Sequence, residues 1–534
     1  MTETLSLVGS GTPARSRPRL AELLAALSLG IDLGFGQPME HVLRQCLIAL
    51  RIAERLELDD EHRAAVYYTA LLINVGCHTD AHEQAKWFGD DIAAKSTKYD
   101  HDMRSVASIL ANLRLLGSGN PPLHRLRVGF EFLAYGHKDV DGMVESHSLL
   151  ARALARDLGL QQRVHEAVAT AYERWDGRGW PGELAGEMVP LASRIAQLAE
   201  FVEVAYRTGG VEAALKLAKE RAGGQFDPDL AATVITHGEE ILAGLDSIES
   251  WEAVISAEPA LWVTLTRDQA ELALTGVADF IDLKSPYTLG HARAVADLVT
   301  AAGDRLDLTT DELALLRHAG LAHGFGRLGV SNAIWDKQGR LAAGEIERVR
   351  MHPYLTERML GQSAWLAPFG AIAGQLRERL DGSGYPRGLK GGSISLAARV
   401  LAAADVYQAM IEPRPHRAAR PPDDAATELR AEVAAHRLDG DAVEAVLAAA
   451  GHARVRRREH PAGLTSREVD VLRLLARGLS HRQIAERLVI SPKTARNHIE
   501  HIYTKIGATS RVTASLYAVQ HGLLPEPSAR SADA

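Results

Sequence analysis

The sequence is poor in cysteine and in aromatic residues, and it has no long apolar run. Its two cysteines, Cys46 and Cys77, are too few for a disulfide framework, which predicts a reducing environment. Aromatic residues make up only 5% of the chain, and this favours packed helices over sheets. No apolar stretch approaches the roughly 20 residues of a membrane-spanning helix, and no leader-like segment opens the chain. These absences predict a soluble, cytoplasmic, helical protein without a membrane partner.

Charge is distributed unevenly along the 534 residues. The whole chain has a formal net charge of −8. Residues 451–534 contain 14 Lys and Arg against 7 Asp and Glu, so residues 1–450 carry −15. A basic C-terminal segment on an acidic body is typical of a nucleic-acid-binding module attached to another domain.

The basic segment contains three helix-start signals. Capping boxes stand at Thr465–Glu468 and Ser480–Gln483, and Ser491–Pro492 is an N-cap followed by proline at the first helical position. Apolar residues recur at helical spacing after each signal. Short helices with a tight connection between them predict a helix-turn-helix arrangement.

The stretch LTSREVDVLRLLARGLSHRQIAERLVISPKTARNHIEHIYTKIGATSR resembles the LuxR-type DNA-binding domain along its full length. The resemblance implies a four-helix domain whose third helix enters the major groove of double-stranded DNA. It also implies a homodimer on two half-sites. Amide and guanidinium groups can read bases, whereas ammonium and hydroxyl groups anchor phosphates. The side chains expected at bases are Arg496, Asn497 and Glu500 (the last either accepting from cytosine or simply solvated), and those expected at phosphates are Lys493, Thr494 and Lys505.

A glycine-rich loop occurs twice in the remaining chain, as WDGRGWPGELAGEMV (175–189) and LDGSGYPRGLKGGSI (380–394). Landmarks around the two loops keep regular offsets: Asp176 and Asp381 lie 205 residues apart, as do His147 and His352, while His41 and His291 lie 250 apart. Regular offsets over this length indicate a duplicated unit. The change of offset predicts about 45 extra residues in the first copy, around Thr79–Pro122.

The second copy resembles an HD-GYP domain from Leu274 to about Ala450. The resemblance lies in IDLKSPYTLGHARAVADL, LAHGFGRLGV, MHPYLTERML and LRERLDGSGYPRGLKGGSISLAARVLAAADVYQAM. That family is all-helical and usually hydrolyses cyclic di-GMP at two or three metal ions, commonly iron or manganese. Its GYP loop lies beside the metal site and helps to shape the substrate pocket. The expected ligand-pocket loop is therefore Asp381, Gly382, Gly384, Tyr385 and Pro386.

The second copy departs from the family at three positions. His323-Gly324 replaces the His-Asp pair, so the carboxylate that usually bridges two metals is missing. Leu376-Arg377 replaces consecutive histidines, and a fixed positive charge at Arg377 opposes a metal cation. Arg327 replaces a lysine. Four candidate ligands remain, enough for a single residual divalent ion: His291, His323, His352 and Asp405.

The first copy departs further. Asn74 stands where the aspartate of the His-Asp pair would be, Ala171-Tyr172 replaces the paired histidines, and Glu200 replaces the later aspartate. Only His41 and His147 match, too few for a metal cluster. The nearby CHTDAH (77–82) contains ligand residue types, but its spacing fits no metal motif, and we interpret it as structural.

We therefore predict an all-α chain of two HD-GYP-like units followed by a four-helix LuxR-type domain. The expected boundaries are a flexible N-terminus (1–17), a first unit (18–245) with its insertion (about 79–122), a second unit (260–450), a basic linker (451–462), the DNA-binding domain (463–525) and a flexible tail (526–534).

The expected function is transcriptional regulation. The body would sense an unknown small molecule or mediate dimerisation, with no catalysis and no cofactor beyond the single residual ion. One alternative is a metal-dependent phosphohydrolase of the cyclic di-GMP phosphodiesterase type with unusual ligands. Another is a purely structural body that dimerises the DNA-binding domains.

Overall fold

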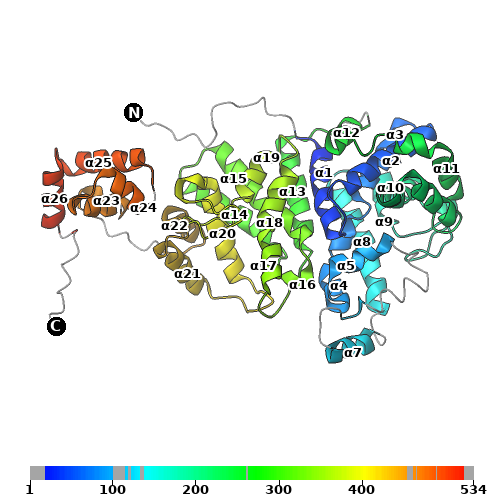
Figure 1. The fold of residues 1–534 in the computed structure, drawn as a ribbon, viewed down its shortest axis with the longest axis horizontal. Coiled ribbons are helices and arrows are strands. Elements are labelled where there is room, and N and C mark those ends of the chain that lie inside the picture. Colours follow the sequence, from blue (N-terminus) through cyan, green and yellow to red (C-terminus); the bar gives the residue numbers. More distant parts are fainter. Residues whose placement is uncertain are drawn as a thin grey trace.

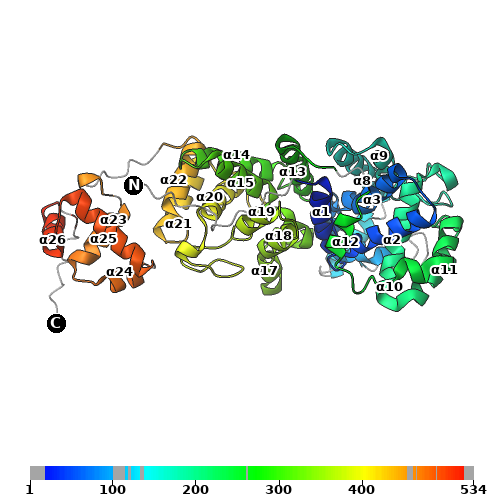
Figure 2. The ribbon, with the colours of Figure 1, turned by 90° about the horizontal axis from the view of Figure 1, so that it is seen from above.

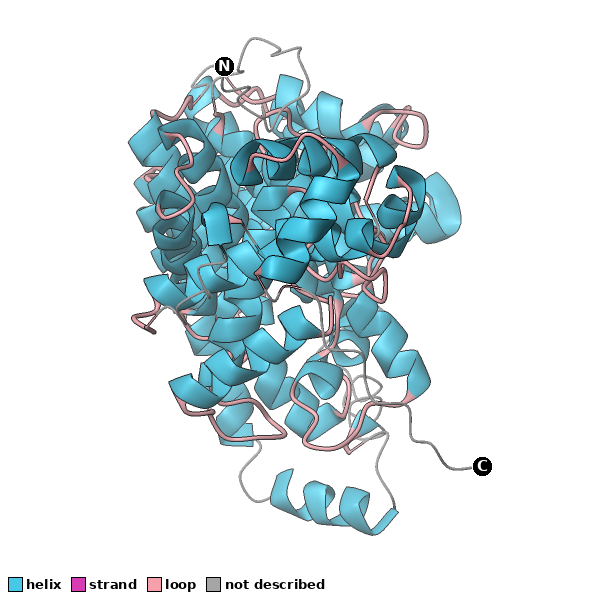
Figure 3. Cartoon of the chain, turned by 90° about the vertical axis from the view of Figure 1, so that its left-hand side faces the viewer, coloured by secondary structure: helices cyan, strands magenta, loops and turns pink. Residues whose placement is uncertain are grey.

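The computed structural model describes residues 18–99, 115–117, 122–132, 137–259, 263–453, 461–464, 466–488, 490–521 and 523 (Figure 1). Within these ranges every regular element is a helix (Figure 3), and the extended pairings are isolated bridges. The predicted all-α fold is confirmed. The expected flexible ends and most of the basic linker lie outside the described ranges.

The first unit contains long helices around a shared apolar core. Its elements are α1 (Leu20–Gly34), α2 (His41–Arg55), α3 (Asp60–Leu72), η1 (Val75–His78), α4 (Ala81–Phe88), α5 (Asp91–Ser96), η2 (Thr97–Tyr99), α7 (Pro122–Glu131), α8 (His137–Asp157), α9 (Gln162–Ala169), η4 (Gly186–Met188), α10 (Leu191–Arg221), α11 (Pro228–Leu242) and α12 (Ser250–Ser256). The elements α4, α5 and η2 fall within the predicted insertion, part of which lies outside the described ranges.

The second unit has a similar order of helices. Its elements are α13 (Arg267–Asp282), α14 (His291–Asp304), α15 (Thr310–Ala322), η5 (Phe325–Gly329), α16 (Asn332–Trp335), α17 (Ala343–Arg350), α18 (His352–Leu360), α19 (Ala367–Ala373), η6 (Gly391–Ser393), α20 (Leu396–Ile411), α21 (Pro422–Ala434) and α22 (Gly440–Ala449). The short helices α16 and α17 lie between η5 and α18.

The repetition extends to single hydrogen bonds. Helices α2 and α14 begin 250 residues apart. A buried aspartate accepts from a backbone N–H in the first turn of each: Asp32 from Val42 at 3.1 Å, and Asp282 from Ala292 at 2.7 Å. Such contacts satisfy donors that a helix start leaves free. The two units therefore share this hydrogen bond at a helix start as well as a similar order of helices.

The two units pack against each other through one continuous core. Helix α1 lies between them and contacts η5 and α18 (Figures 1 and 2). Leu328 approaches Gly30 so closely that an added Cβ would lie 2.7 Å from its side chain. Asp91, at the start of α5, is fully buried against residues of the second unit. The insertion of the first unit is thus part of the interface.

The C-terminal domain has its own apolar core, separate from that of the body. It contains η7 (Pro461–Gly463), α23 (Ser466–Ala476), α24 (His481–Leu488), α25 (Pro492–Ile506) and α26 (Arg511–Gln520). The predicted N-cap of α25 is confirmed, because Ser491 accepts from the N–H of Thr494 at 3.0 Å. The box that begins at Ser480 is also confirmed, with Gln483 returning a bond to its backbone. Thr465 lies outside the described ranges.

Candidate functional site

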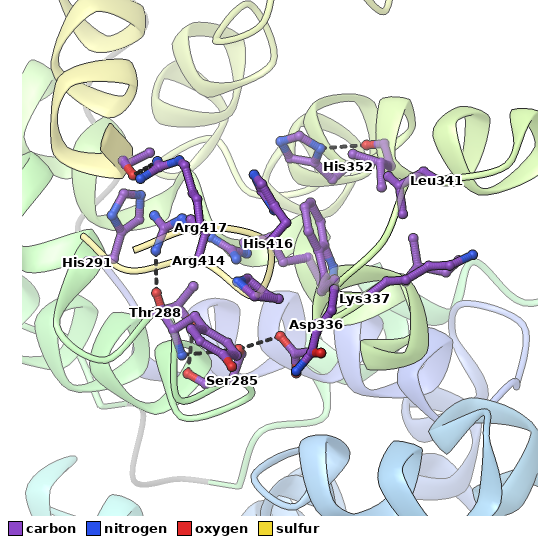
Figure 4. Close-up of a pocket in the computed structure, with 18 of the residues that line it drawn as sticks. Ser285, Thr288, His291, Asp336, Lys337, Leu341, His352, Arg414, His416 and Arg417 are labelled. Carbon is purple, nitrogen blue, oxygen red and sulfur yellow. Dashed lines mark hydrogen bonds between the residues drawn. The ribbon is translucent and has the colours of Figure 1, made fainter. Parts of the chain in front are cut away.

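A cavity of about 690 Å³ opens in the second unit (Figure 4). Its walls come from the α13–α14 loop, η5, α16, the segment that leads to α18, and α20 with the loop that follows it. Six lining side chains carry a positive charge: Arg327, Lys337, Arg340, Arg377, Arg414 and Arg417. Only Asp336 and Asp405 oppose them in the lining. The cavity is suited to an anion.

Three residues from separate helices meet at the inner end of this cavity. His291 opens α14, His323 ends α15, and Asp405 lies on α20; all three are buried. Asp405 Oδ1 lies 3.2 Å from His291 Nε2 and 3.7 Å from His323 Nε2. Their candidate ligand atoms lie within 4.8 Å of one another, the one such group of three in the described ranges.

The two histidines have opposite protonation tendencies. Burial lowers the pKa of His323 to about 4. Its Nδ1–H donates to the carbonyl of Gly320 at 2.6 Å, which leaves the buried Nε2 with a lone pair and no hydrogen-bond partner. Burial alone would also lower the pKa of His291, but Asp405 and Glu412 raise it above its usual value. His323 therefore presents a free lone pair to a metal, whereas the raised pKa of His291 works against metal binding.

Arg377 opposes metal binding at this group. Its guanidinium lies 3.0 Å from Asp405 Oδ2. Burial alone would raise the pKa of Asp405, but Arg377 and His291 hold it well below its usual range. Leu376 is buried and offers no ligand atom, and Gly324 offers no side chain. The donors fit one ion and do not fit two.

His352 is not part of the three-residue group, although the sequence predicted it as a fourth ligand. It faces the same cavity, but its Nδ1 bonds to the carbonyl of Val349 at 2.6 Å. Its ring lies edge-on to Trp335, with centroids 5.5 Å apart. Burial and the nearby Arg377 lower its pKa to about 3. His352 is thus a neutral wall residue.

The expected ligand-pocket loop is also absent from the cavity wall. None of Asp381–Pro386 lines the cavity. The loop folds back on itself because the Glu378 carboxylate accepts from the N–H groups of Arg387 and Leu389, each at 2.8 Å. Tyr385 lies behind the wall, with its ring centroid 6.4 Å from that of His352. The loop 381–386 therefore lies behind His352, and other residues line the cavity.

Two lining arginines, Arg414 and Arg417, were not identified from the sequence pattern. They lie in the loop after α20 (Figure 4), where Arg414 bonds Glu412 at 2.9 Å. Arg417 is held by backbone carbonyls, including that of Met410 at 2.9 Å. The basic run PRPHRAAR (413–420) is the sequence feature that could have indicated an anion-binding role for this loop.

The equivalent centre of the first unit contains a lysine. Lys98, from η2, places its Nζ 2.7 and 3.0 Å from the two Glu200 oxygens and 3.0 Å from Asn74 Oδ1. Tyr99 also donates to Glu200, at 2.8 Å. Burial alone would raise the pKa of Glu200, but Lys98 lowers it below its usual value. A tethered ammonium thus neutralises the acidic residue that corresponds to Asp405.

Residues of the CHTDAH segment contact different neighbours. Cys77 lies against His147 and Tyr172, and Asp80 pairs with His147. His78 bonds the Phe280 carbonyl at 2.8 Å. These contacts tie the segment both to the first unit and, through Phe280, to the second.

Helix α25 presents the predicted DNA-contacting side chains to solvent. Five exposed residues lie along it: Lys493, Thr494, Arg496, Asn497 and Glu500. Arg496 Nε and Glu500 Oε1 form a pair at 2.9 Å. Lys505, near the end of the helix, is exposed but bonds Glu468 at 2.8 Å. Three of these six side chains, Lys493, Thr494 and Asn497, are therefore placed without an ion pair in the described structure.

No helix in the described ranges is long and apolar enough to cross a membrane.

Comparison with known families gives matches in the body and in the C-terminal domain. A model described as an HD domain matches residues 138–230 and 276–442. A model described as bacterial regulatory proteins, luxR family, matches residues 462–518. These matches agree with the two resemblances seen in the sequence.

Relatives of known activity cover the body. The 3′3′-cGAMP-specific phosphodiesterase 3 of Vibrio cholerae serotype O1 is 33% identical over 411 residues, which is 76% of this chain and 89% of the relative. A cyclic di-GMP phosphodiesterase of Thermotoga maritima is 30% identical over 159 residues, 29% of this chain and 43% of the relative. The crystal structure of a cyclic GMP-AMP-specific phosphodiesterase in V. cholerae covers 82% of this chain and 99% of its own, with a TM-score of 0.58 and 29% identity.

Proposed function

Since this chain belongs to the HD-domain phosphodiesterase family and ends in a domain of the LuxR family of bacterial regulatory proteins, we propose that it is a DNA-binding transcriptional regulator. Its second unit would bind a cyclic dinucleotide without hydrolysing it, and the protein would act in the cytoplasm as a homodimer. Relatives named as 3′3′-cGAMP and cyclic di-GMP phosphodiesterases support this class of ligand.

The observation that carries the proposal is the position of Arg377. Its guanidinium lies 3.0 Å from the Asp405 carboxylate, which it neutralises with a permanent positive charge. A guanidinium has five N–H donors, so it can hold Asp405 and still offer donors to a phosphate. A phosphodiester can therefore find its counter-charge here without a metal ion.

The rest of the cavity supports the same ligand class. Arg327 and Arg414 line it within the same volume of about 690 Å³, and they add positive charge. Tyr287 and Trp335 also line it, with Arg327 over the Trp335 ring at 4.7 Å from its centroid, and bases stack on aromatic rings of this kind. The charges suit two phosphates, and the aromatic rings suit two bases.

Loss of catalysis follows from the number of metal donors. A bound ion at His291, His323 and Asp405 would polarise a phosphoryl oxygen and lower the pKa of a water. At a two-metal phosphodiester site the two ions together neutralise the attacking and leaving oxygens. Gly324 and Leu376 supply no donors for a second ion. We infer that cleavage is absent.

A metal-dependent phosphohydrolase is the second candidate. It is favoured by the unpartnered Nε2 of His323, which faces Asp405 as a ligand would, and by the activity of the relatives. On this alternative Arg377 would have to move away from Asp405 when the ion binds.

Calorimetric titration of the full chain with cyclic di-GMP and 3′3′-cGAMP in EDTA tests the proposal. We expect binding, and we expect Arg377→Ala to weaken it about 10- to 100-fold because a charge-assisted hydrogen bond is lost. The matched control is Arg358→Ala, an exposed arginine on α18 outside the cavity, which should bind normally. No release of linear dinucleotide is expected with added manganese or iron. Turnover abolished by His323→Ala would instead establish the phosphohydrolase.

Pairing of two chains is supported by an apolar stripe on α26. Val512, Leu516 and Val519 follow one another at helical spacing and are 76%, 55% and 61% exposed. Apolar side chains gathered on one exposed helix face are typical of an interface. Two domains joined here would present two copies of α25 to a pseudo-palindromic site.

A further inference from the structure

The first unit contacts the wall of the second unit's cavity. His82, on α4, places its Nδ1 2.8 Å from Asp336 Oδ2. Its ring lies edge-on to Tyr287, with centroids 6.3 Å apart. Asp336 and Tyr287 both line the cavity, whereas His82 does not. A residue of the first unit thus stands directly behind two wall residues of the second.

Asp336 joins two segments of that wall. Its Oδ1 accepts from the Ser285 hydroxyl at 2.7 Å (Figure 4). Its Oδ2 accepts from the Asn332 side-chain amide at 2.8 Å. The α13–α14 loop and α16 therefore share one carboxylate, and His82 is its third partner. Removing His82 takes away one of the three side chains that hold the carboxylate in place.

A buried ion cluster fixes the position of the segment that carries His82. Asp91, on α5, is 0% exposed. It accepts from the Ser331 hydroxyl at 2.6 Å and from the N–H of Asn332 at 2.8 Å, and Lys284 Nζ lies 3.5 Å away. All three partners belong to the second unit. The α4–α5 segment is therefore anchored beside the same loop and helix that Asp336 joins.

We propose that His82 is a positioning residue for the second unit's cavity. It holds Asp336, and through Asp336 the loop that bears Tyr287, in the arrangement that receives the ligand. The first unit thereby sets the affinity of a site that it does not line. The ligand part of this inference rests on the proposed function; the positioning part does not.

The charge state of His82 gives the contact a pH dependence. The hydrogen bond to Asp336 raises the pKa of His82 above its usual value; burial lowers it, Glu83 raises it further and Lys86 lowers it. The imidazolium form is therefore present below this raised pKa. As pH rises through it, the bond to Asp336 loses its charge assistance and weakens.

Hydrogen–deuterium exchange of the ligand-free full chain provides the first test. In His82→Ala the amides of residues 284–288 and 332–337 should exchange several-fold faster, because Asp336 loses one of the three side chains that hold it. His82→Gln, which can still donate to Asp336, should restore slow exchange. The control is His165→Ala on α9, away from the cavity, which should match the wild-type protein. Unchanged exchange in His82→Ala would overturn the proposal.

Titration with cyclic di-GMP and 3′3′-cGAMP provides the second test. His82→Ala should weaken binding about 3- to 10-fold, the equivalent of one hydrogen bond. Wild-type affinity should fall as pH rises through the His82 pKa, and His82→Gln should lose this pH trend while keeping near-normal affinity. A trend that persists in His82→Gln counts against the proposal. If the wild-type chain binds neither dinucleotide, the proposed function fails and the exchange experiment alone decides the role of His82.

Discussion

Both HD units place a basic side chain on the acidic residue at their centre. Arg377 pairs with Asp405 in the second unit, and Lys98 pairs with Glu200 in the first. The two bases come from unrelated positions, since Lys98 lies on η2 and Arg377 follows α19. The two ion pairs have the same electrostatic effect, because in each a basic side chain supplies part of the positive charge that a metal ion would supply.

Loss of the Lys98 ammonium should be costly at the residue scale. Lys98→Met leaves Glu200 buried without its counter-charge, and chemical denaturation should show about 3–5 kcal/mol of lost stability at neutral pH. The loss should shrink in acid. The pKa of Glu200 is lowered in the folded chain, so the ion pair stabilises the fold above the unfolded-state pKa. As pH falls through the folded-state pKa, Glu200 is protonated in both the folded and the unfolded chain, and the ion pair no longer contributes.

The control is the double variant Lys98→Met with Glu200→Gln, which removes both charges and should recover most of the stability. If Lys98→Met alone were as stable as the wild-type chain, the pair would contribute nothing to folding.

At the scale of elements, α25 separates its two faces cleanly. Ala495, Ile499 and Ile502 are buried against the domain core, while Lys493 and Asn497 face solvent. The helix begins at a satisfied cap and ends at Gly507, whose φ of 66° only glycine adopts readily. Both ends are therefore defined, which fixes the helix that would enter the groove.

Substitutions on α25 should separate affinity from specificity. Asn497→Ala should reduce discrimination at one base pair by about 1–3 kcal/mol, because a bidentate amide contact is lost. Lys493→Ala should weaken binding to specific and random DNA alike and lower the salt dependence. Fluorescence anisotropy at several salt concentrations measures both. An equal loss on specific and random DNA in Asn497→Ala would contradict the assignment.

At the scale of the whole molecule, three units follow one another in a row, with the DNA-binding domain at one end (Figure 2). The body and this domain have separate cores, so neither depends on the other for burial of its apolar residues. The stripe on α26 is exposed at this end of the molecule. Pairing through it would join the DNA-binding ends of two chains.

Disruption of the α26 stripe should therefore change assembly without unfolding the chain. Leu516→Lys places a charge at the centre of the stripe, and sedimentation should show a shift from dimer to monomer and weaker binding to a two-half-site DNA. Thr509→Lys, at an exposed position in the loop before α26, is the matched control. A dimer that persists in Leu516→Lys would place the interface elsewhere.

Much of the fold was predictable because the helix-start signals and the repeated landmarks in the sequence occur where the folded chain has helix starts and matching helices. The caps at Ser480 and Ser491 and the regular offsets of His41 and His291 are properties of short segments, and the structure uses them as the sequence indicates. The grouping of His291 with His323 and Asp405 followed from the family resemblance.

The remaining features depend on contacts between distant segments. No local pattern reveals that Lys98 reaches Glu200 across 102 residues, or that His82 reaches Asp336 across 254. His352 was assigned as a ligand from its position in the motif; its ring lines the cavity, but its nitrogens lie outside the group formed by His291, His323 and Asp405. Side-chain direction, and with it the true wall of the cavity, is set by packing.

Because Lys98 is part of the chain, the charge at the centre of the first unit does not depend on a supply of metal ions. A metal ion must be acquired after synthesis, from a supply that varies with nutrition and with competition among other proteins. An ammonium group arrives with the chain itself, once per molecule, as soon as residue 98 is translated. Growth under iron starvation, or in the presence of a chelator, would therefore leave the first unit complete, and a cell that lacks iron would still possess the half of the body against which the second unit packs.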